Sequence, residues 1–182
     1  MERGFCESAL EHLDGLYGYA MTLARNEAEA EDLVQETYLR AVRAFGQLRP
    51  DNNLKSWLFT ILRNVRLNQV RYSQSTPRTM ERDDPANQVQ ELEDKSSKNP
   101  FVSYLTKVKQ ADVRKAIDNL PATYREVIVL REFEELSYGE IVQILDCPPG
   151  TVMSRLSRAR EKLKEMLPQW STSEAARMAG QP

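Results

Sequence analysis

Apolar residues recur at spacings of three and four along most of the chain, and strand-like alternation is absent. In the first half this pattern predicts three helices. Their apolar stripes are Leu13, Leu16, Tyr17, Ala20, Leu23 and Ala24; Ala30, Leu33, Val34, Tyr38, Ala41 and Phe45; and Leu54, Trp57, Leu58, Ile61, Leu62 and Val65. Each helix has one apolar face, so the three should pack together. Asn26 is in position to cap the second helix, and the turn-rich stretch 49–53 separates the second from the third.

The helical pattern stops at about residue 73, and the chain up to Pro100 is rich in Ser, Asn, Gln and Pro. This composition is typical of a flexible linker, and a linker of this length indicates two domains. We expect a first domain at 1–72, a linker at 73–105, a second domain at 106–167 and a polar tail at 168–182.

The second half contains the most specific local signal, the capping-box spacing of Ser137 and Glu140. The helix that they begin ends at the turn-forming segment 146–150, and a longer helix follows to about Leu167. A short capped helix, a tight turn and a longer helix make a helix-turn-helix. This motif should bury Ile141, Leu145, Val152 and Leu156. The predicted fold class is all-α, with two small helical domains joined by a flexible linker and a helix-turn-helix in the second.

The last helix of the motif has a basic outer surface. Its outward positions are Thr151, Met153, Ser154, Arg155, Ser157, Arg158, Arg160, Lys162 and Lys164. Lys and Arg contact phosphates, and Arg pairs with guanine through two hydrogen bonds, so this helix is a candidate for the major groove of DNA. A solvated helix with cations near its C-terminus explains Lys162 and Lys164, but not Arg155 and Arg158 in the first two turns.

The first domain has two candidate surfaces of different chemistry. On the second helix, Asp32, Gln35, Glu36 and Arg40 form a polar ridge that suits docking on a basic protein surface. Acidic residues near a helix N-terminus are also favoured by the helix dipole, so spacing alone leaves both explanations open. The third helix combines aromatic, amide and basic residues, which suits single-stranded nucleic acid. Its exposed candidates are Asn52, Asn53, Lys55, Arg63 and Asn64.

Composition restricts the possible functions. The net charge is −2, whereas independent DNA binding usually needs an excess of cations, so contact with DNA as part of a larger basic assembly fits better. Cys6, Cys147 and the single His12 indicate no disulfide framework, metal site or cofactor. No signal peptide and no apolar run of about 18 residues is apparent, so we expect a cytoplasmic protein without membrane contact of its own.

Three blocks of this sequence resemble a known family, the RNA polymerase sigma factors of the extracytoplasmic-function group of the sigma-70 family. Residues 31–40 (EDLVQETYLR) resemble the core-binding helix of sigma region 2, and residues 54–64 (LKSWLFTILRN) its promoter-melting helix. Residues 136–141 (LSYGEI) and 150–156 (GTVMSRL) resemble the helix-turn-helix of sigma region 4. Three blocks in the same order are far more specific than one helix-turn-helix.

The resemblance implies partners and roles for matching residues. Core RNA polymerase would be bound at its beta-prime clamp helices by Asp32, Gln35, Glu36 and Arg40, and at its beta flap. The minus-ten promoter element, as single-stranded DNA, would be bound by Asn52, Asn53, Lys55, Arg63 and Asn64. The minus-thirty-five element, as duplex, would be bound by Thr151, Met153, Ser154, Arg155 and Arg158. An anti-sigma factor is a further implied partner, a stress or envelope and redox response is the implied setting, and the holoenzyme would be associated with the nucleoid.

Two other functions compete with this one. A stand-alone helix-turn-helix regulator would bind a palindromic site without polymerase, and the net negative charge and the linker argue against it. A metal-dependent hydrolase using the carboxylates of segment 27–36 lacks a histidine at ligand spacing and a glycine-rich phosphate loop. We therefore expect a sigma factor without enzymatic activity.

Overall fold

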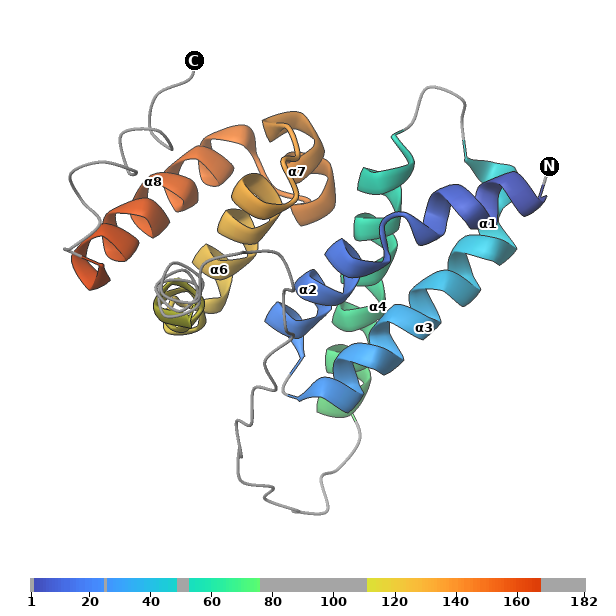
Figure 1. Cartoon of the computed structure of the whole chain (residues 1–182), viewed down its shortest axis with the longest axis horizontal. Coiled ribbons are helices and arrows are strands. Elements are labelled where there is room, and N and C mark those ends of the chain that lie inside the picture. The colour runs from blue at the N-terminus through green and yellow to red at the C-terminus, as the bar shows by residue number, and fades with distance from the viewer. Residues whose placement is uncertain (1, 25, 49–52, 76–110, 168–182) are drawn as a thin grey trace, which may run out of the picture.

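The structure is a computed structural model that describes residues 2–24, 26–48, 53–75 and 111–167. All regular secondary structure in these ranges is helical, which confirms the predicted all-α class. The helices form two groups, one from each half of the chain, and the groups lie against each other (Figure 1). Residue Asn52, most of the expected linker and the expected tail lie outside the described residues.

The first group contains four α-helices and one short 3-10 turn. They are α1 (Glu2–Leu10), α2 (Leu13–Leu23), α3 (Glu27–Ala44), η1 (Phe45–Gln47) and α4 (Leu54–Ser75). The three predicted helices are present as α2, α3 and α4, whereas α1 was not expected from the apolar pattern. It is held by Phe5, whose ring lies 4.3 Å from that of Phe45 and 6.4 Å from that of Trp57, measured between centroids.

Packing of α2, α3 and α4 gives this group its core. Leu16, Leu33, Leu58 and Leu62 are fully buried between the helices, which is where the three-and-four spacing of the sequence put them. The predicted cap of α3 is also present, because the Asn26 side chain accepts a hydrogen bond of 2.8 Å from the backbone N–H of Glu29. Local sequence therefore accounts for where these helices lie and which face each one buries.

The second group begins with helical residues 111–118 and continues through four named elements. They are α6 (Ala122–Ile128), the π-helical turn η2 (Val129–Phe133), α7 (Tyr138–Leu145) and α8 (Pro149–Met166). The π-helical turn was not predicted. Its last hydrogen bond joins the N–H of Glu134 to the carbonyl of Val129 (3.1 Å), and Glu135 follows with a left-handed backbone, φ 54°. These two features turn the chain from η2 toward α7.

The helix-turn-helix is confirmed as α7 and α8. The Ser137 N–H donates to Glu140 Oε2 (2.8 Å), and the Glu140 N–H donates to the Ser137 hydroxyl (3.3 Å), so the capping box is closed in both directions. Asp146 ends α7 in the left-handed conformation, φ 46° and ψ 55°. The four positions expected inside the motif, Ile141, Leu145, Val152 and Leu156, are all buried.

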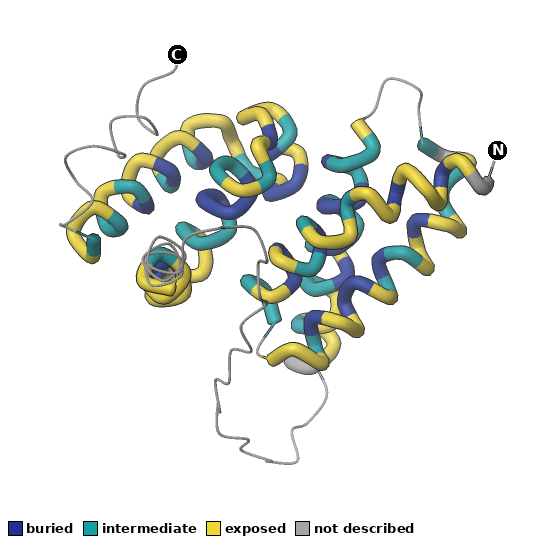
Figure 2. The backbone as a smooth tube through the Cα atoms, viewed as in Figure 1, coloured by how far each residue is buried: buried dark blue, intermediate teal, exposed yellow. Residues whose placement is uncertain are grey.

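The two groups share one hydrophobic core. Buried residues of both belong to a single cluster, with α4 beside α7 and α2 beside α6 (Figure 2). Helix α4 also continues to Ser75, which is three residues into the segment expected to be linker. The side-by-side packing of the two groups is the main feature that the sequence did not predict.

Replacing Ser137 by Ala should destabilise the second group by about 1 kcal/mol, because the first turn of α7 loses its side-chain acceptor. Urea unfolding followed by circular dichroism measures this change. Ser157→Ala is the matched control, since Ser157 is exposed on α8 and caps no helix. Equal stability of the Ser137→Ala variant and the wild type would show that the capping box contributes nothing.

Candidate nucleic-acid and polymerase interfaces

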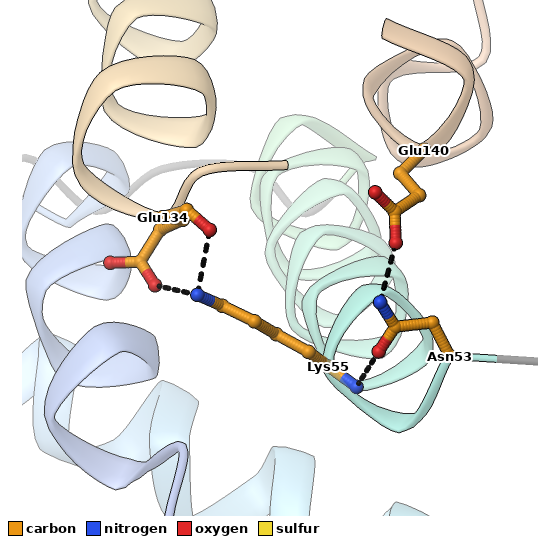
Figure 3. A network of polar contacts seen from close by, with 4 residues as sticks. All are labelled: Asn53, Lys55, Glu134 and Glu140. Atoms are coloured by element: carbon orange, nitrogen blue, oxygen red, sulfur yellow. Dashed lines mark hydrogen bonds and ion pairs between the residues drawn. The ribbon is translucent and has the colours of Figure 1, made fainter. Parts of the chain in front are cut away.

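The polar side of α4 faces the second group of helices, where Lys55 of α4 and Asn53, the residue directly before the helix, meet glutamates (Figure 3). Lys55 Nζ donates to the main-chain carbonyl of Glu134 (2.7 Å) and lies 3.0 Å from Oε2 of the same residue. Asn53 Nδ2 donates to Glu140 Oε1 (2.6 Å). Both residues were predicted to bind the minus-ten element, and here both are bound within the chain.

The two carboxylate oxygens of Glu140 accept hydrogen bonds from different partners. Its Oε2 accepts from the backbone N–H and the hydroxyl of Ser137, and its Oε1 accepts from Asn53. Partial burial opposes ionisation of Glu140, but the hydrogen bonds from Ser137 and Asn53 outweigh it and lower the pKa of the carboxyl. The residue that caps α7 therefore also joins α7 to α4.

A third contact between the two groups of helices is made by Glu126 of α6. The Nε of Arg63 lies 3.6 Å from Glu126 Oε1, and the Nη1 of Arg63 donates to the carbonyl of Ile144 (3.3 Å). The hydroxyl of the fully buried Tyr19 donates to the same Glu126 oxygen at 3.5 Å. Burial raises the pKa of the Glu126 carboxyl, and the nearby charges of Arg63 and Arg155 act in the opposite direction. A buried carboxylate needs such partners, so Arg63 and Glu126 depend on each other.

Gly15 of α2 lets the Glu134 side chain come this close. A Cβ atom at Gly15 would collide with the Glu134 carboxylate, whereas one at Gly18, a turn further along α2, would meet nothing within 4 Å. The absence of a side chain at position 15 therefore leaves the space in which Glu134 reaches Lys55.

The predicted minus-thirty-five residues on α8 divide into two sets. Met153, Ser154 and Arg158 are exposed, so they are available to a partner. Thr151 and Arg155 are half-buried. The positive charge of Arg155 is close enough to Glu126 to lower the pKa of that carboxyl, so Arg155 interacts within the chain.

Arg160, which the helical pattern also placed on the outer surface, is bound within its own domain. Its guanidinium pairs with Glu132 of η2, with 2.7 Å between Nη2 and Oε1. Burial and the contact with Glu132 have opposite effects on Arg160, and the net result is a raised pKa. This pair holds α8 to η2, which leaves Arg158 as the exposed arginine in the middle of the helix.

The predicted polymerase-binding ridge lies on the outer side of α3. Asp32 and Gln35 are exposed, and Arg40 Nε pairs with Glu36 Oε1 at 2.6 Å. Leu39 and Val42 lie on the same side of the helix with 53% and 55% of their surfaces exposed. Sequence reasoning did not include them, although both are apolar residues outside the buried stripe of α3, which was the available signal.

The two remaining candidates for the minus-ten element are Asn64 and Asn52. Asn64 is exposed on α4, and Asn52 lies outside the described residues.

In the described ranges no group of three metal-binding side chains was found, and no helix there is long and apolar enough to cross a membrane. Sequence reasoning missed that Glu126, Glu134 and Glu140 meet the first group of helices, because no local pattern marks Glu126 or Glu134, and the pattern at Glu140 predicted only its role as a cap of α7.

Both halves of the chain match families of known proteins. The family "Sigma-70 region 2" matches residues 9–76, and the family "Sigma-70, region 4" matches residues 110–163. The RNA polymerase sigma-H factor of Pseudomonas aeruginosa is 32% identical over 91% of this chain and 87% of its own length. The ECF RNA polymerase sigma factor EcfG of Rhodopseudomonas palustris is 33% identical over 88% of this chain and 83% of its own.

Among solved structures, the sigma factor RpoE of Bartonella quintana, crystallised with the anti-sigma factor NepR, is similar in fold. The TM-score is 0.69 at 32% identity, and the alignment covers 91% of this chain and 98% of the other. The similarity extends over both groups of helices.

Replacing Glu140 by Gln should remove a pH-dependent part of the stability. Because the folded pKa of Glu140 lies below its ordinary value of 4.5, its contribution is present above that value and is lost as the pH falls through the folded pKa. The wild type should thus be more stable than the variant at pH 7, and the difference should shrink at about pH 3. Urea unfolding at both pH values measures it, with the exposed Glu161→Gln as the control for charge loss; a constant difference would contradict this role.

Proposed function

Because this chain belongs to the extracytoplasmic-function sigma factors of the sigma-70 family, which bind core RNA polymerase and direct transcription initiation, we propose a role for each of its surfaces. The first domain, at 1–72, binds the polymerase core and the minus-ten element. A linker at 73–105 joins it to the second domain, at 106–167, which binds the minus-thirty-five element. The match of both halves to sigma-70 regions favours this function over that of a stand-alone regulator.

The outer side of α3 binds the beta-prime clamp helices of polymerase. The single observation that carries this assignment is the exposed combination of Asp32 and Gln35 with Leu39 and Val42. Apolar side chains exposed inside a polar rim are characteristic of protein interfaces. Glu36 and Arg40 complete the rim, and their mutual ion pair keeps both side chains on this face.

DNA is bound by residues of α4 and α8. Lys55, Arg63 and Asn64 of α4, with Asn52 and Asn53 in the preceding loop, contact the unpaired strand of the minus-ten element, where cations follow the backbone and amides bind bases. On α8, Met153, Ser154 and Arg158 enter the major groove of the minus-thirty-five element, with Thr151 and Arg155 at the margin. The polymerase supplies most of the nonspecific attraction to DNA, which reconciles this function with a net charge of −2.

The remaining assignments are proposed by analogy with the family. The protein is a transcription initiation factor that has no enzymatic activity of its own and needs no cofactor. It acts in the cytoplasm, at the nucleoid when in the holoenzyme, in a stress or envelope and redox response. An anti-sigma factor holds it inactive; the support is the Bartonella quintana sigma factor of similar fold, which was crystallised with such a partner.

Replacing Asp32 by Ala should weaken binding to core RNA polymerase about tenfold, which corresponds to loss of one charged contact of about 1.4 kcal/mol. Biolayer interferometry with immobilised core enzyme measures the affinity. Glu161→Ala is the matched control, because Glu161 is an exposed acid of α8, in the second domain. Equal affinities for the two variants would remove α3 from the interface, and no binding of the wild type would reject the proposed function.

Replacing Arg158 by Ala should lower transcription by reconstituted holoenzyme about tenfold on promoters that it selects from a random minus-thirty-five library, since a good arginine contact to a base is worth about 1–3 kcal/mol. Lys164→Ala, an exposed cation in the last turn of the same helix, should change transcription little. If the two variants lost transcription equally, α8 would contribute general positive charge rather than recognition.

A further inference from the structure

Met153 is an apolar side chain on the outer face of the helix that we propose for the major groove. It lies in the first two turns of α8, and 57% of its surface is exposed. The helix buries Val152 and Leu156 on its other side, and Figure 2 shows a band of exposed positions along it. Met153 is therefore not part of the core of its own domain and is available to a partner.

The side chain of Met153 extends further from the helix than those of its exposed neighbours. On a helix the surface neighbours of a residue lie three or four positions away, which here are Gly150 and Ser157. Both are exposed, and one has no side chain while the other has a short one. Ser154, the next exposed residue, is also short. The thioether of Met153 is thus the group on this part of α8 that reaches furthest toward a partner.

The chemistry of Met153 also differs from that of the polar residues beside it. The Ser154 hydroxyl donates to the carbonyl of Thr151 (3.0 Å), which leaves its oxygen as an acceptor for a partner. A thioether donates no hydrogen bond and accepts only weakly. What Met153 offers to a partner is therefore apolar surface.

The major groove presents one apolar group that such a surface can cover. The base edges of adenine, guanine and cytosine carry hydrogen-bond donors and acceptors there, and thymine alone adds a methyl group, at C5. Covering one methyl group is worth about fourfold in affinity, which corresponds to about 0.8 kcal/mol per buried carbon. The exposed thioether and the thymine methyl group are thus matched in chemistry.

The position of Met153 along α8 supports the same partner. In a helix-turn-helix the N-terminal residues of the second helix contact the base edges. Met166 is exposed as well, at 41%, but it lies in the last turn, about 20 Å further along the helix at 1.5 Å per residue. Met153 is at the end of α8 that reaches bases, and Met166 is at the end that does not.

We propose that Met153 recognises a thymine of the minus-thirty-five element by covering its C5-methyl group. The proposal rests on the function assigned above to α8 and adds the chemical group that this residue selects. Hydrogen bonds to base edges are made by polar residues of the same helix, Arg158 among them. Replacing the thymine by uracil removes the methyl group and leaves the base pair and its hydrogen-bonding groups unchanged.

The experiment uses holoenzyme reconstituted from core polymerase and the full-length chain. The wild type first selects a minus-thirty-five element from a random library. Each thymine of either strand of that element is then replaced singly by deoxyuridine, and competition binding measures the affinity of the holoenzyme for each promoter. One of these replacements should weaken binding of the wild type about fourfold.

Two substitutions test whether the methionine causes this effect. Met153→Gln keeps the length of the side chain but replaces the thioether by an amide, so the same uracil replacement should leave its affinity unchanged. Met153→Leu keeps an apolar side chain and should keep the sensitivity to uracil. Met166→Gln is the matched control, because it makes the same chemical change in the last turn of α8 and should respond to uracil as the wild type does.

Equal affinity of the wild type for the thymine and uracil forms at every position would overturn the proposal. Equal sensitivity of the wild type and Met153→Gln would do so too, as would a selected element that contains no A·T pair. If the chain formed no holoenzyme, or if the holoenzyme selected no minus-thirty-five element, the proposed function would be rejected together with this proposal. Selection of an element that is insensitive to uracil rejects the role of Met153 alone.

Discussion

Helix α4 packs against helices of both domains, and the rest of the structure depends on how its side chains are paired in these two contacts. One side carries Leu58 and Leu62, which are fully buried. Another carries Lys55 and Arg63, whose charged groups need partners once the second domain covers them. Burying a cation without a partner costs several kcal/mol, so the glutamates of the second domain are a condition for this packing.

The same constraint shows how an acidic protein can contain the two surfaces that we propose for DNA. Three of its acids meet Asn53, Lys55 and Arg63, so part of the positive potential along α4 is cancelled inside the molecule. Arg160 is similarly matched by Glu132, whereas Arg158 remains exposed. The charge that DNA would meet therefore depends on the arrangement of the domains as well as on composition, and net charge alone underestimates it.

Secondary structure and domain packing are coupled through a few side chains. Glu140 caps α7 with one oxygen and binds Asn53 with the other, so the start of the helix-turn-helix is also a domain contact. The π-helical turn η2 ends at Phe133, directly before Glu134, and Gly15 of α2 leaves room for the Glu134 carboxylate. The π-helical turn and Gly15 thus together position the ion pair of Lys55 and Glu134. Such π-helical turns are frequent at functional sites.

The sequence by itself determined helices α2, α3, α4, α7 and α8, their buried faces, the caps at Asn26 and Ser137, and the helix-turn-helix. These features depend on residues three or four positions apart, whose relation is visible in the chain itself. Residue types also indicated the polar ridge of α3 and the basic face of α8. Helix α1 was missed because Phe5 is held by Phe45 and Trp57, far along the chain.

Only the tertiary structure decided which acids meet the candidate DNA-binding residues. Lys55 and Glu134 are separated by 79 positions in the chain, and Asn53 and Glu140 by 87. No local pattern selects one glutamate among many as the partner of a distant lysine. That choice is made when the apolar faces of both domains are buried together, because the shape of the shared core sets which polar side chains are brought within hydrogen-bond distance.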